Sequence, residues 1–506
     1  MTEGVPQGLE IGGPVTAAFV GYLLLVVGIG LWATRFSSAG IGEFFLGGRR
    51  MNRFVVALSA VVSGRSAWLL LGVTGMAYSR GASAVWAVAG YVVVELLLFL
   101  FYAPRLRRFS EAYDCLTVPD FFAARFGDRG GGLRLLLVAV ILIFMVSYVA
   151  AQFVAGGKAF GASFGMDPDA GVALTAAIVL LYTVLGGFLA VSVTDLLQAL
   201  FMIVALVALP VAAVTRAGGL PGVVAELTAL DATLVDPWAL SAGALLGFLG
   251  IGLGSPGNPH ILVRYMSIGD PDQLRTSAVV GTVWNVLMGW GALFIGLAGR
   301  VYFPDPAALP GADTENLYPT LAALHLHPVL LGLVIASIFA AIMSTADSQL
   351  LVAASSVVRD LYEKVLRRGR ELPQRRLVVL SRVVVVALVA LALGLGLVAS
   401  EIVFWLVLFA WAGLGAALGP ASLLALFWRR TTRAGVAAGI VTGTAVTLLW
   451  QSTPALDAAL YELIPAFLLA TVATVGVSLL GQPPDDAAGM LRRMRPPTAG
   501  GSDAAG

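Results

Sequence analysis

The chain has 506 residues, of which 59% are hydrophobic and 12% charged, whereas a soluble domain has about 45–50% apolar and about 25% charged residues. This composition excludes an ordinary soluble globular protein and predicts a chain embedded in a lipid bilayer. The net charge of +2 gives no reason to expect a nucleic-acid partner. A single cysteine excludes an intrachain disulfide, and three histidines without metal-ligand spacing argue against a zinc site.

Apolar stretches of about 20 residues, long enough to cross a bilayer, follow one another along almost the whole chain. Thirteen are predicted: 14–34, 54–79, 83–103, 133–157, 170–189, 192–215, 239–263, 277–299, 328–357, 377–399, 402–426, 434–451 and 459–480. Residues 1–481 are therefore expected to form a single transmembrane domain. Residues 482–506 are rich in Pro, Gly, Ala and charge, and are expected to be a disordered cytoplasmic tail.

The basic residues test the number of spans, because cytoplasmic loops carry an excess of positive charge. With the N-terminus outside, the outside loops hold only Arg80, Lys158, Arg216 and Arg300 of the 31 Lys and Arg residues. Arg65 falls within a span, and the others, Arg264 included, fall on the inside. An odd number of spans is therefore expected. The protein is expected in the plasma membrane, with its N-terminus outside and its C-terminus in the cytoplasm.

Two predicted spans are interrupted near their middle. The second contains Ser63-Gly64-Arg65-Ser66, and the seventh contains Gly254-Ser255-Pro256-Gly257-Asn258-Pro259, in which each proline removes a helical donor. Irregular backbone at membrane depth is tolerated where protein or a water-filled cavity surrounds it. The interruptions are five spans apart, so they predict two inverted five-helix repeats, about 52–215 and 239–426, with a transport site between them. Packing glycines or a lipid-exposed kink are the structural alternative.

Four ionisable residues lie in or near spans, where a charge is costly without a partner: Arg65, Glu95, Asp195 and Asp347. Asp347 follows Ser344 and Thr345, whose hydroxyls could help to bind a hard monovalent cation, or could bond carbonyls of their own helix. Asp195 is interpreted as either a helix N-terminal residue or a second cation ligand. Glu95 has no polar neighbours in the sequence and is assigned no role.

The chain resembles the sodium:solute symporters, and most closely their sodium/proline branch. The matching stretches are Phe45-Leu46-Gly47-Gly48-Arg49, Ala57-Leu58-Ser59-Ala60, Leu116-Thr117-Val118-Pro119-Asp120-Phe121, Gly186-Gly187-Phe188-Leu189-Ala190-Val191-Ser192, Pro259-His260-Ile261-Leu262, Ala341-Ile342-Met343-Ser344-Thr345 and Ala410-Trp411-Ala412-Gly413. The resemblance implies an all-α membrane protein of about thirteen helices, a five-plus-five inverted core and sodium as the coupling ion.

The resemblance also implies site residues. Its sodium site would use the carbonyls of Val62, Arg65 and Ala341 with the hydroxyls of Ser344 and Thr345, and Asp195 would lie near the sodium path. Its substrate site would include Arg65, Trp68, Tyr148, Ile251 and Ser255. Gly64 stands where proline carriers have an aspartate, Arg65 where they have a methionine, and Ile251 and Ser255 where they have aromatic residues. These departures widen the expected substrates from proline to other amino acids and small carboxylates.

Arg65 has three interpretations. Its guanidinium could bind a substrate carboxylate, pair with Asp347 and so take the place of a cation, or form a purely structural ion pair. The sequence predicts a sodium-coupled secondary symporter that works by alternating access, with a sodium-independent or proton-coupled carrier as the alternative. An enzyme is not expected because catalytic spacings are lacking, and a sensor is not expected because a signalling module is lacking. No obligate protein partner is evident.

Overall fold

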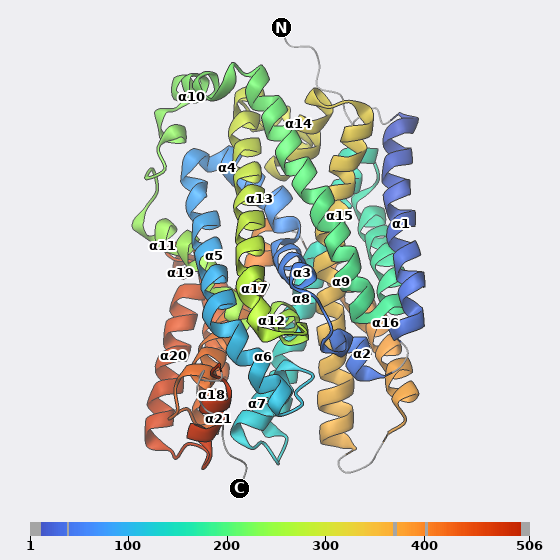
Figure 1. Ribbon diagram of the computed structural model, residues 1–506. Coiled ribbons are helices and arrows are strands. Elements are labelled where there is room, and N and C mark those ends of the chain that lie inside the picture. The colour runs from blue at the N-terminus through green and yellow to red at the C-terminus, as the bar shows by residue number, and fades with distance from the viewer. Residues whose placement is uncertain (1–11, 38–39, 368–371, 400–402, 497–506) are drawn as a thin grey trace.

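The computed structural model describes residues 12–37, 40–367, 372–399 and 403–496. Within these ranges the chain is helical, and the only β-type pairing is an isolated bridge between Met51 and Ile268. Long helices stand roughly upright side by side, with the start of α1 at the top of Figure 1 and α21 at the bottom.

The helices have the following bounds: α1 (Gly13–Ser37), α2 (Ile41–Leu46), α3 (Arg53–Ala67), α4 (Thr74–Arg80), α5 (Val85–Leu97), α6 (Ala103–Ala112), α7 (Val118–Phe126), α8 (Gly132–Phe164), α9 (Pro168–Arg216), α10 (Gly219–Leu230), α11 (Ala242–Gly250), α12 (Pro259–Ser267), α13 (Leu274–Tyr302), α14 (Leu317–His325), α15 (Pro328–Ser355), α16 (Gln374–Val398), α17 (Val403–Phe427), α18 (Arg433–Gln451), α19 (Pro454–Asp457), α20 (Leu463–Leu480) and α21 (Ala487–Arg493). Tighter or wider turns continue some of them, namely η2 (Trp68–Val73), η4 (Leu98–Tyr102), η6 (Ile251–Gly257) and η11 (Ser356–Leu366).

Ten helical stretches of the described chain are long and apolar enough to cross a membrane, and Pro168–Val184 and Ala242–Gly257 are shorter apolar helices. One of the ten, Arg53–Ala112, turns back at Gly81, whose φ is 65° and whose Cβ would lie 2.2 Å from the Leu234 carbonyl oxygen. A side chain cannot fit there, so glycine permits the hairpin between α4 and α5. The count of thirteen spans stays a prediction.

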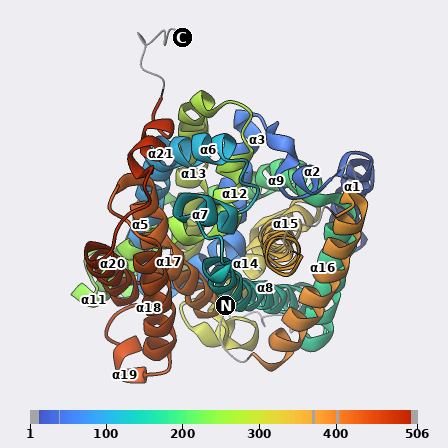
Figure 2. The same cartoon turned by 90° about the horizontal axis from the view of Figure 1, so that it is seen from below.

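The helices divide into a buried centre and an apolar rim. In α15 and α17, 83% of the most apolar window is buried inside the protein, and Figure 2 shows α15 enclosed by α8, α9 and α16. Large apolar side chains are exposed on the outer helices, among them Leu24, Val93, Val398 and Leu480. A water-soluble surface rarely carries so wide an apolar area, whereas a lipid-facing surface requires it.

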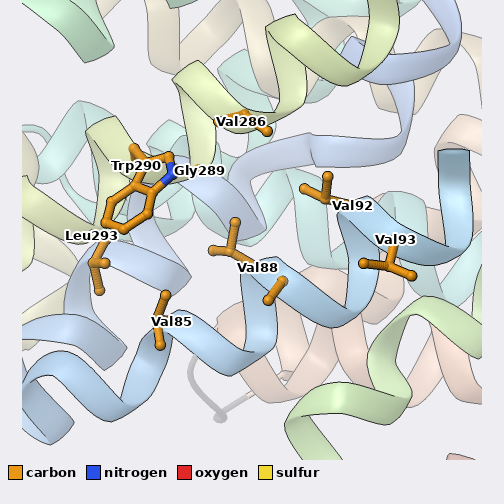
Figure 3. A pocket seen from close by; sticks show the side chains of 9 residues that line it. Val85, Val88, Val92, Val93, Val286, Gly289, Trp290 and Leu293 are labelled. Atoms are coloured by element: carbon orange, nitrogen blue, oxygen red, sulfur yellow. The ribbon is translucent and has the colours of Figure 1, made fainter. Parts of the chain in front are cut away.

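A hollow of about 250 Å³ lies between α5 and α13 (Figure 3). Valines from both helices line it together with Gly289, Trp290 and Leu293, and none of its described lining residues is charged. It therefore offers nothing to hold a polar solute.

The expectation of a disordered tail is wrong for part of residues 482–506. Ala487–Arg493 form α21, which packs against α6, and Met494 is fully buried. The Arg493 guanidinium lies 5.8 Å from the Tyr113 ring centroid. The apolar Ala487 and Met494 give this helix a face to bury, which a composition rich in Pro and Gly conceals. Residues 497–506 lie outside the described chain.

Candidate functional site

The first predicted interruption is a real break. Ser66 has φ 51° and ψ −171°, a conformation that costs free energy for a non-glycine residue, and the chain continues beyond it through η2 into α4. Two backbone N–H groups freed by the break are satisfied locally. Ala67 N–H donates to Gln152 Oε1 of α8 at 3.1 Å, and Trp68 N–H donates to Ser66 Oγ at 3.1 Å. Gln152 therefore belongs to the site, although no local motif marks it.

The second interruption is also real. α11 ends at Gly250, η6 forms a tight turn, and Asn258 is extended before α12 begins at Pro259. Trp411 Nε1–H of α17 donates to the Ile251 carbonyl at 2.8 Å. A Cβ on Gly254 would lie 1.9 Å from Trp411 Nε1, so glycine is required where α17 packs on the break.

The two breaks lie side by side in the buried centre. The Tyr148 ring packs edge-on against the His260 ring of α12 at 6.1 Å, and its hydroxyl is 3.5 Å from Ser66 Oγ of the first break. A Cβ on Gly64 would lie 3.2 Å from Ile261 Cδ1. Tyr148 thus contacts both breaks, as expected for a residue of a site between them.

Aromatic rings from other helices line the first break. Trp68 stacks between Tyr91 of α5 and Phe404 of α17, with ring centroids 6.4 and 6.0 Å apart, and Tyr91 stacks on Trp411 at 5.4 Å. Rings from α5 and α17, rather than from positions 251 and 255, therefore line the first break. The sequence motif Ala410-Trp411-Ala412-Gly413 pointed to one of these rings, that of Trp411, whereas nothing in the sequence singled out Tyr91.

Tyr91 also explains the departure at Gly64. Its hydroxyl donates to the Gly64 carbonyl at 3.2 Å, and a Cβ on Gly64 would lie 2.4 Å from the same oxygen. A side chain at position 64, such as the aspartate that the resemblance led us to expect, cannot fit here unless the Tyr91 ring moves.

The Arg65 side chain points toward α5 and α13. Its Nε donates to Asn285 Oδ1 at 2.8 Å, and its Nη2 is 3.5 Å from Glu95 Oε2. Its guanidinium carbon lies 3.4 Å from the Tyr91 ring centroid, and Asn285 Nδ2 donates to the same Glu95 oxygen. Glu95 is thus the buried partner of Arg65, although the sequence assigned it no role.

The hypothesis that Arg65 pairs with Asp347 is wrong for this structure. Asp347 accepts hydrogen bonds from the Tyr182 hydroxyl of α9 and from Ser348 Oγ at 2.9 Å. Each carboxylate therefore has its own partners, and Arg65 is bound on the α5 side of the first break.

One predicted sodium ligand, Thr345 of α15, contacts the first break. Thr345 Oγ1 donates to the Ser63 carbonyl at 2.9 Å, while Ser344 Oγ donates to the Ala341 carbonyl of its own helix at 3.1 Å. Val62 and Arg65 flank Ser63 on the side of the break. The donor set consists of neutral hydroxyl and carbonyl oxygens, as Na⁺ requires. Ser63 Oγ is buried without a hydrogen-bond partner among the described residues, which leaves a further oxygen available.

Two interpretations from the sequence need correction. Arg264 is not in an inside loop, because α12 continues to Ser267 and buries Arg264 to 1% exposure. Asp195 does not begin a helix, because the non-helical residue of α9 is Gly187 and Asp195 lies two turns beyond it.

Instead, Arg264 and Asp195 form a buried ion pair. Arg264 Nη2 lies 2.8 Å from Asp195 Oδ2, and Ser59 Oγ bonds both partners at 2.6 and 2.5 Å. The same Nη2 also donates to Ser348 Oγ of α15. One guanidinium therefore joins the second broken helix to α3, α9 and α15. A sequence gives no signal for this, since the four residues are far apart along it.

The comparisons with known proteins decide the family. The sodium:solute symporter family matches residues 44–443. The chain belongs to this family. It is therefore a multi-pass membrane transporter that couples solute movement to sodium, rather than an enzyme.

Two curated relatives of this symporter come from Bacillus subtilis (strain 168). The chain is 37% identical to the osmoregulated proline transporter OpuE, over 92% of its own length and 94% of that protein. It is 38% identical to the high-affinity proline transporter PutP, over 91% and 96%.

Solved structures of transporters share the fold of this symporter. A Na⁺-coupled sialic acid symporter in a substrate-bound, outward-open state matches with a TM-score of 0.78 at 20% identity, over 93% of this chain and 99% of that one. MhsT in complex with L-phenylalanine matches with a TM-score of 0.55 at 14% identity, over 85% and 98%. The expected all-helical transporter fold with an inverted-repeat core is thereby confirmed.

The symporter has a polar cavity on one side of the breaks. A cavity of about 620 Å³ lies between α4, α11, α17 and the connection from α18 to α20, and Ile251 of the second break lines it. In Figure 1, α4 lies toward the end of the bundle where α10 and α14 are found, and α11 and α19 lie at about mid-height on the left.

Ion pairs close the other end of the symporter, where α7 lies at the bottom of Figure 1. Arg134 of α8 lies 2.7 Å from Asp120 of α7 and also pairs with Asp360 of η11, and Arg359 lies 3.3 Å from Asp120. Although burial raises the pKa of Asp120, its ion pairs with Arg359 and Arg134 leave that pKa below the usual value. The carboxylate is therefore charged, and the cluster joins α7, α8 and η11.

Proposed function

We propose that this symporter takes up proline, or a small amino acid of similar size, together with sodium by alternating access. The observation that carries the proposal is the meeting of two broken helices beside the hydroxyls of α15. Freed backbone groups and hydroxyls provide cation ligands there, and aromatic rings provide an apolar surface for a small aliphatic solute. The names of two relatives that share more than a third of the sequence support proline.

Sodium would bind to the carbonyls of Val62, Arg65 and Ala341 and to the hydroxyls of Ser344 and Thr345. In this arrangement Thr345 gives up its bond to the Ser63 carbonyl and turns a lone pair to the ion. Binding of sodium would therefore tighten the contact between α15 and the first break, which helps to form the adjoining solute site.

The solute would bind between the breaks, against Trp68, Tyr148, Ile251 and Ser255. Ser255 Oγ is fully buried without a hydrogen-bond partner among the described residues, so it is available to a solute carboxylate. For Arg65 we propose a backbone role at the sodium site, while its side chain neutralises Glu95. Asp195 and Asp347 would couple the helices through Arg264, Ser348 and Tyr182, rather than bind the ion directly.

We also propose the orientation that the basic residues favour, with the N-terminus outside and the C-terminus inside the plasma membrane. In this orientation the cavity beside Ile251 opens outward, and the Asp120 cluster closes the inner side. A membrane potential of about 100 mV contributes about 2.3 kcal/mol per sodium ion, enough for a solute gradient of about 50-fold.

The test is uptake of radiolabelled proline into proteoliposomes as a function of external sodium. Thr345→Ala should raise the sodium concentration for half-maximal uptake at least tenfold while leaving uptake at saturating sodium largely intact. Thr447→Ala is the matched control, because Thr447 is a buried hydroxyl of α18 that bonds its own helix. Proline uptake by the parent that does not depend on sodium would refute the proposed coupling site.

A further inference from the structure

Two arginines meet at the C-terminal end of α17. Arg105 of α6 donates to the Leu426 carbonyl at 3.0 Å, and Arg125 of α7 donates to the Ala425 carbonyl at 3.0 Å. These carbonyls are consecutive and belong to the last turn of α17, so the two guanidinium groups lie next to each other. Among the described residues, no carboxylate forms an ion pair with either arginine.

Further positive charge surrounds this pair. Arg495, which follows α21, is exposed and lies close enough to Arg105 for the two charges to repel each other. Arg429 and Arg430 come directly after α17 and are also exposed. A helix C-terminus offers the equivalent of about half a negative charge, which offsets only part of this positive charge. The end of α17 therefore favours the binding of an anion.

Arg125 is the most costly member of the group. It is 0% exposed, its Nη1 lies 4.0 Å from Met490 Sδ of α21, and its Nη2 is buried without a hydrogen-bond partner among the described residues. A buried guanidinium without a counter-charge is unfavourable. A negative charge bound beside it would offset this cost, because screening is weak at a buried site.

The arginines lie beside side chains that face lipid. Figure 1 shows α6, α7 and α21 at the end of the bundle opposite α10 and α14. The Arg105 guanidinium carbon lies 4.3 Å from the ring centroid of Phe427, which is 43% exposed at the end of α17. Leu480, the last residue of α20, is 89% exposed, and Thr432 N–H donates to Ser478 Oγ, so the ends of α17 and α20 are joined. Guanidinium groups next to exposed apolar side chains mark the boundary between hydrocarbon and lipid head groups.

We propose that an arginine cluster, consisting of Arg105, Arg125 and Arg495, binds the phosphate group of an anionic phospholipid such as phosphatidylglycerol. The phosphate accepts hydrogen bonds from Arg105 and Arg495 and reduces the electrostatic cost of Arg125, while the acyl chains lie against Phe427 and Leu480. Guanidinium groups bind phosphate with two parallel hydrogen bonds, and basic pockets at the cytoplasmic ends of membrane helices bind anionic head groups.

The bound lipid would join α6, α17 and α21. α17 also packs on the second break, where Trp411 donates to the Ile251 carbonyl, so the lipid would hold a helix that contacts the transport site. The inference uses the proposed orientation to place the lipid in the inner leaflet, and it does not depend on which solute is carried.

A purely structural role for the arginines makes different predictions. Arg105 and Arg125 could serve only to bond the last carbonyls of α17, which requires no lipid. A general attraction of basic residues to a negative membrane surface would also occur, but it would fall equally when any two arginines of the inner side are removed. A specific site depends on the arginine cluster alone.

The experiment measures thermal unfolding of the purified full-length chain in neutral detergent during titration with phosphatidylglycerol, phosphatidylcholine or soluble glycerol phosphate. Native mass spectrometry counts the lipids retained. One variant combines Arg105→Gln with Arg495→Gln. A second carries Arg495→Gln alone, which should not disturb folding because this side chain is exposed. The control combines Arg275→Gln with Arg376→Gln, which removes two exposed charges near the starts of α13 and α16.

Phosphatidylglycerol should raise the unfolding temperature of the parent by about 3 °C or more, whereas phosphatidylcholine and glycerol phosphate should not. The concentration of phosphatidylglycerol that gives half of this effect should rise at least tenfold in the variant lacking both arginines, about threefold in Arg495→Gln, and less than twofold in the control. One phosphatidylglycerol should remain on the parent and be lost from the variant lacking both arginines.

Three results would overturn the lipid site. Equal stabilisation by phosphatidylcholine would show that the head-group charge is not recognised, and equal stabilisation by glycerol phosphate would show that the ligand is a free phosphate. An equal loss in the control variant would show a general charge effect. Since the measurement is stability rather than transport, failure of the proposed proline uptake would leave these outcomes unchanged.

Discussion

Replacing Arg65 and Glu95 first singly and then together tests whether the Arg65 side chain binds the solute or only stabilises the protein by pairing with Glu95. In Arg65→Met, Glu95 keeps Asn285 as a donor but loses its cation at 1% exposure. Breaking a buried ion pair from one side costs about 3–5 kcal/mol, whereas replacing both partners by neutral groups is often close to neutral. Arg65→Met combined with Glu95→Gln should therefore be more stable than Arg65→Met alone.

The assay is a double-mutant cycle of unfolding free energies in detergent, with sodium-dependent uptake measured on the same three variants. The cycle isolates the coupling between the two side chains, which we expect to reach about 2 kcal/mol or more. Uptake by the double variant should keep the sodium dependence of the parent, because the proposed ligand at position 65 is the backbone carbonyl.

Two results would refute the reasoning. Additive single effects, with a coupling energy within about 0.5 kcal/mol of zero, would mean that the two charges do not stabilise each other. A double variant that is stable but takes up no solute would show that the Arg65 guanidinium takes part in solute binding.

Two further outcomes are expected. Arg134→Gln should open the inner ion-pair cluster. Cys115 is 1% exposed and burial raises the pKa of its thiol, so the variant's thiol should react with a maleimide at least fivefold faster than the parent's, as followed by mass spectrometry. An unchanged rate would show that the cluster does not hold the inner side closed. Gly254→Ala should destabilise the protein by about 1–3 kcal/mol in thermal unfolding and reduce uptake, while Gly394→Ala, where a Cβ meets open space, should change neither.

Local chemistry was sufficient for the sequence to predict the two broken helices. The glycines and prolines between Gly250 and Pro259 cannot continue a helix wherever the segment lies, and the apolar composition of the flanking residues requires the break to be surrounded by protein. Ser344 and Thr345 were likewise predicted as cation ligands from their neighbours in one helix. These features depend on residues within about a dozen positions of one another, so they can be read without knowing the packing.

The partners of the buried charges were decided by the tertiary structure. Arg65 meets Glu95 and Asn285 because α13 packs against both α3 and α5, and Arg264 meets Asp195 because α3 packs against both α12 and α9. Each charge has several potential partners in the sequence, and the free energy of burial selects the one that helix packing brings within bonding distance. The sequence by itself determined where the helices break and that buried charges need partners, whereas only the packing of helices far apart in the chain determined which partners they have.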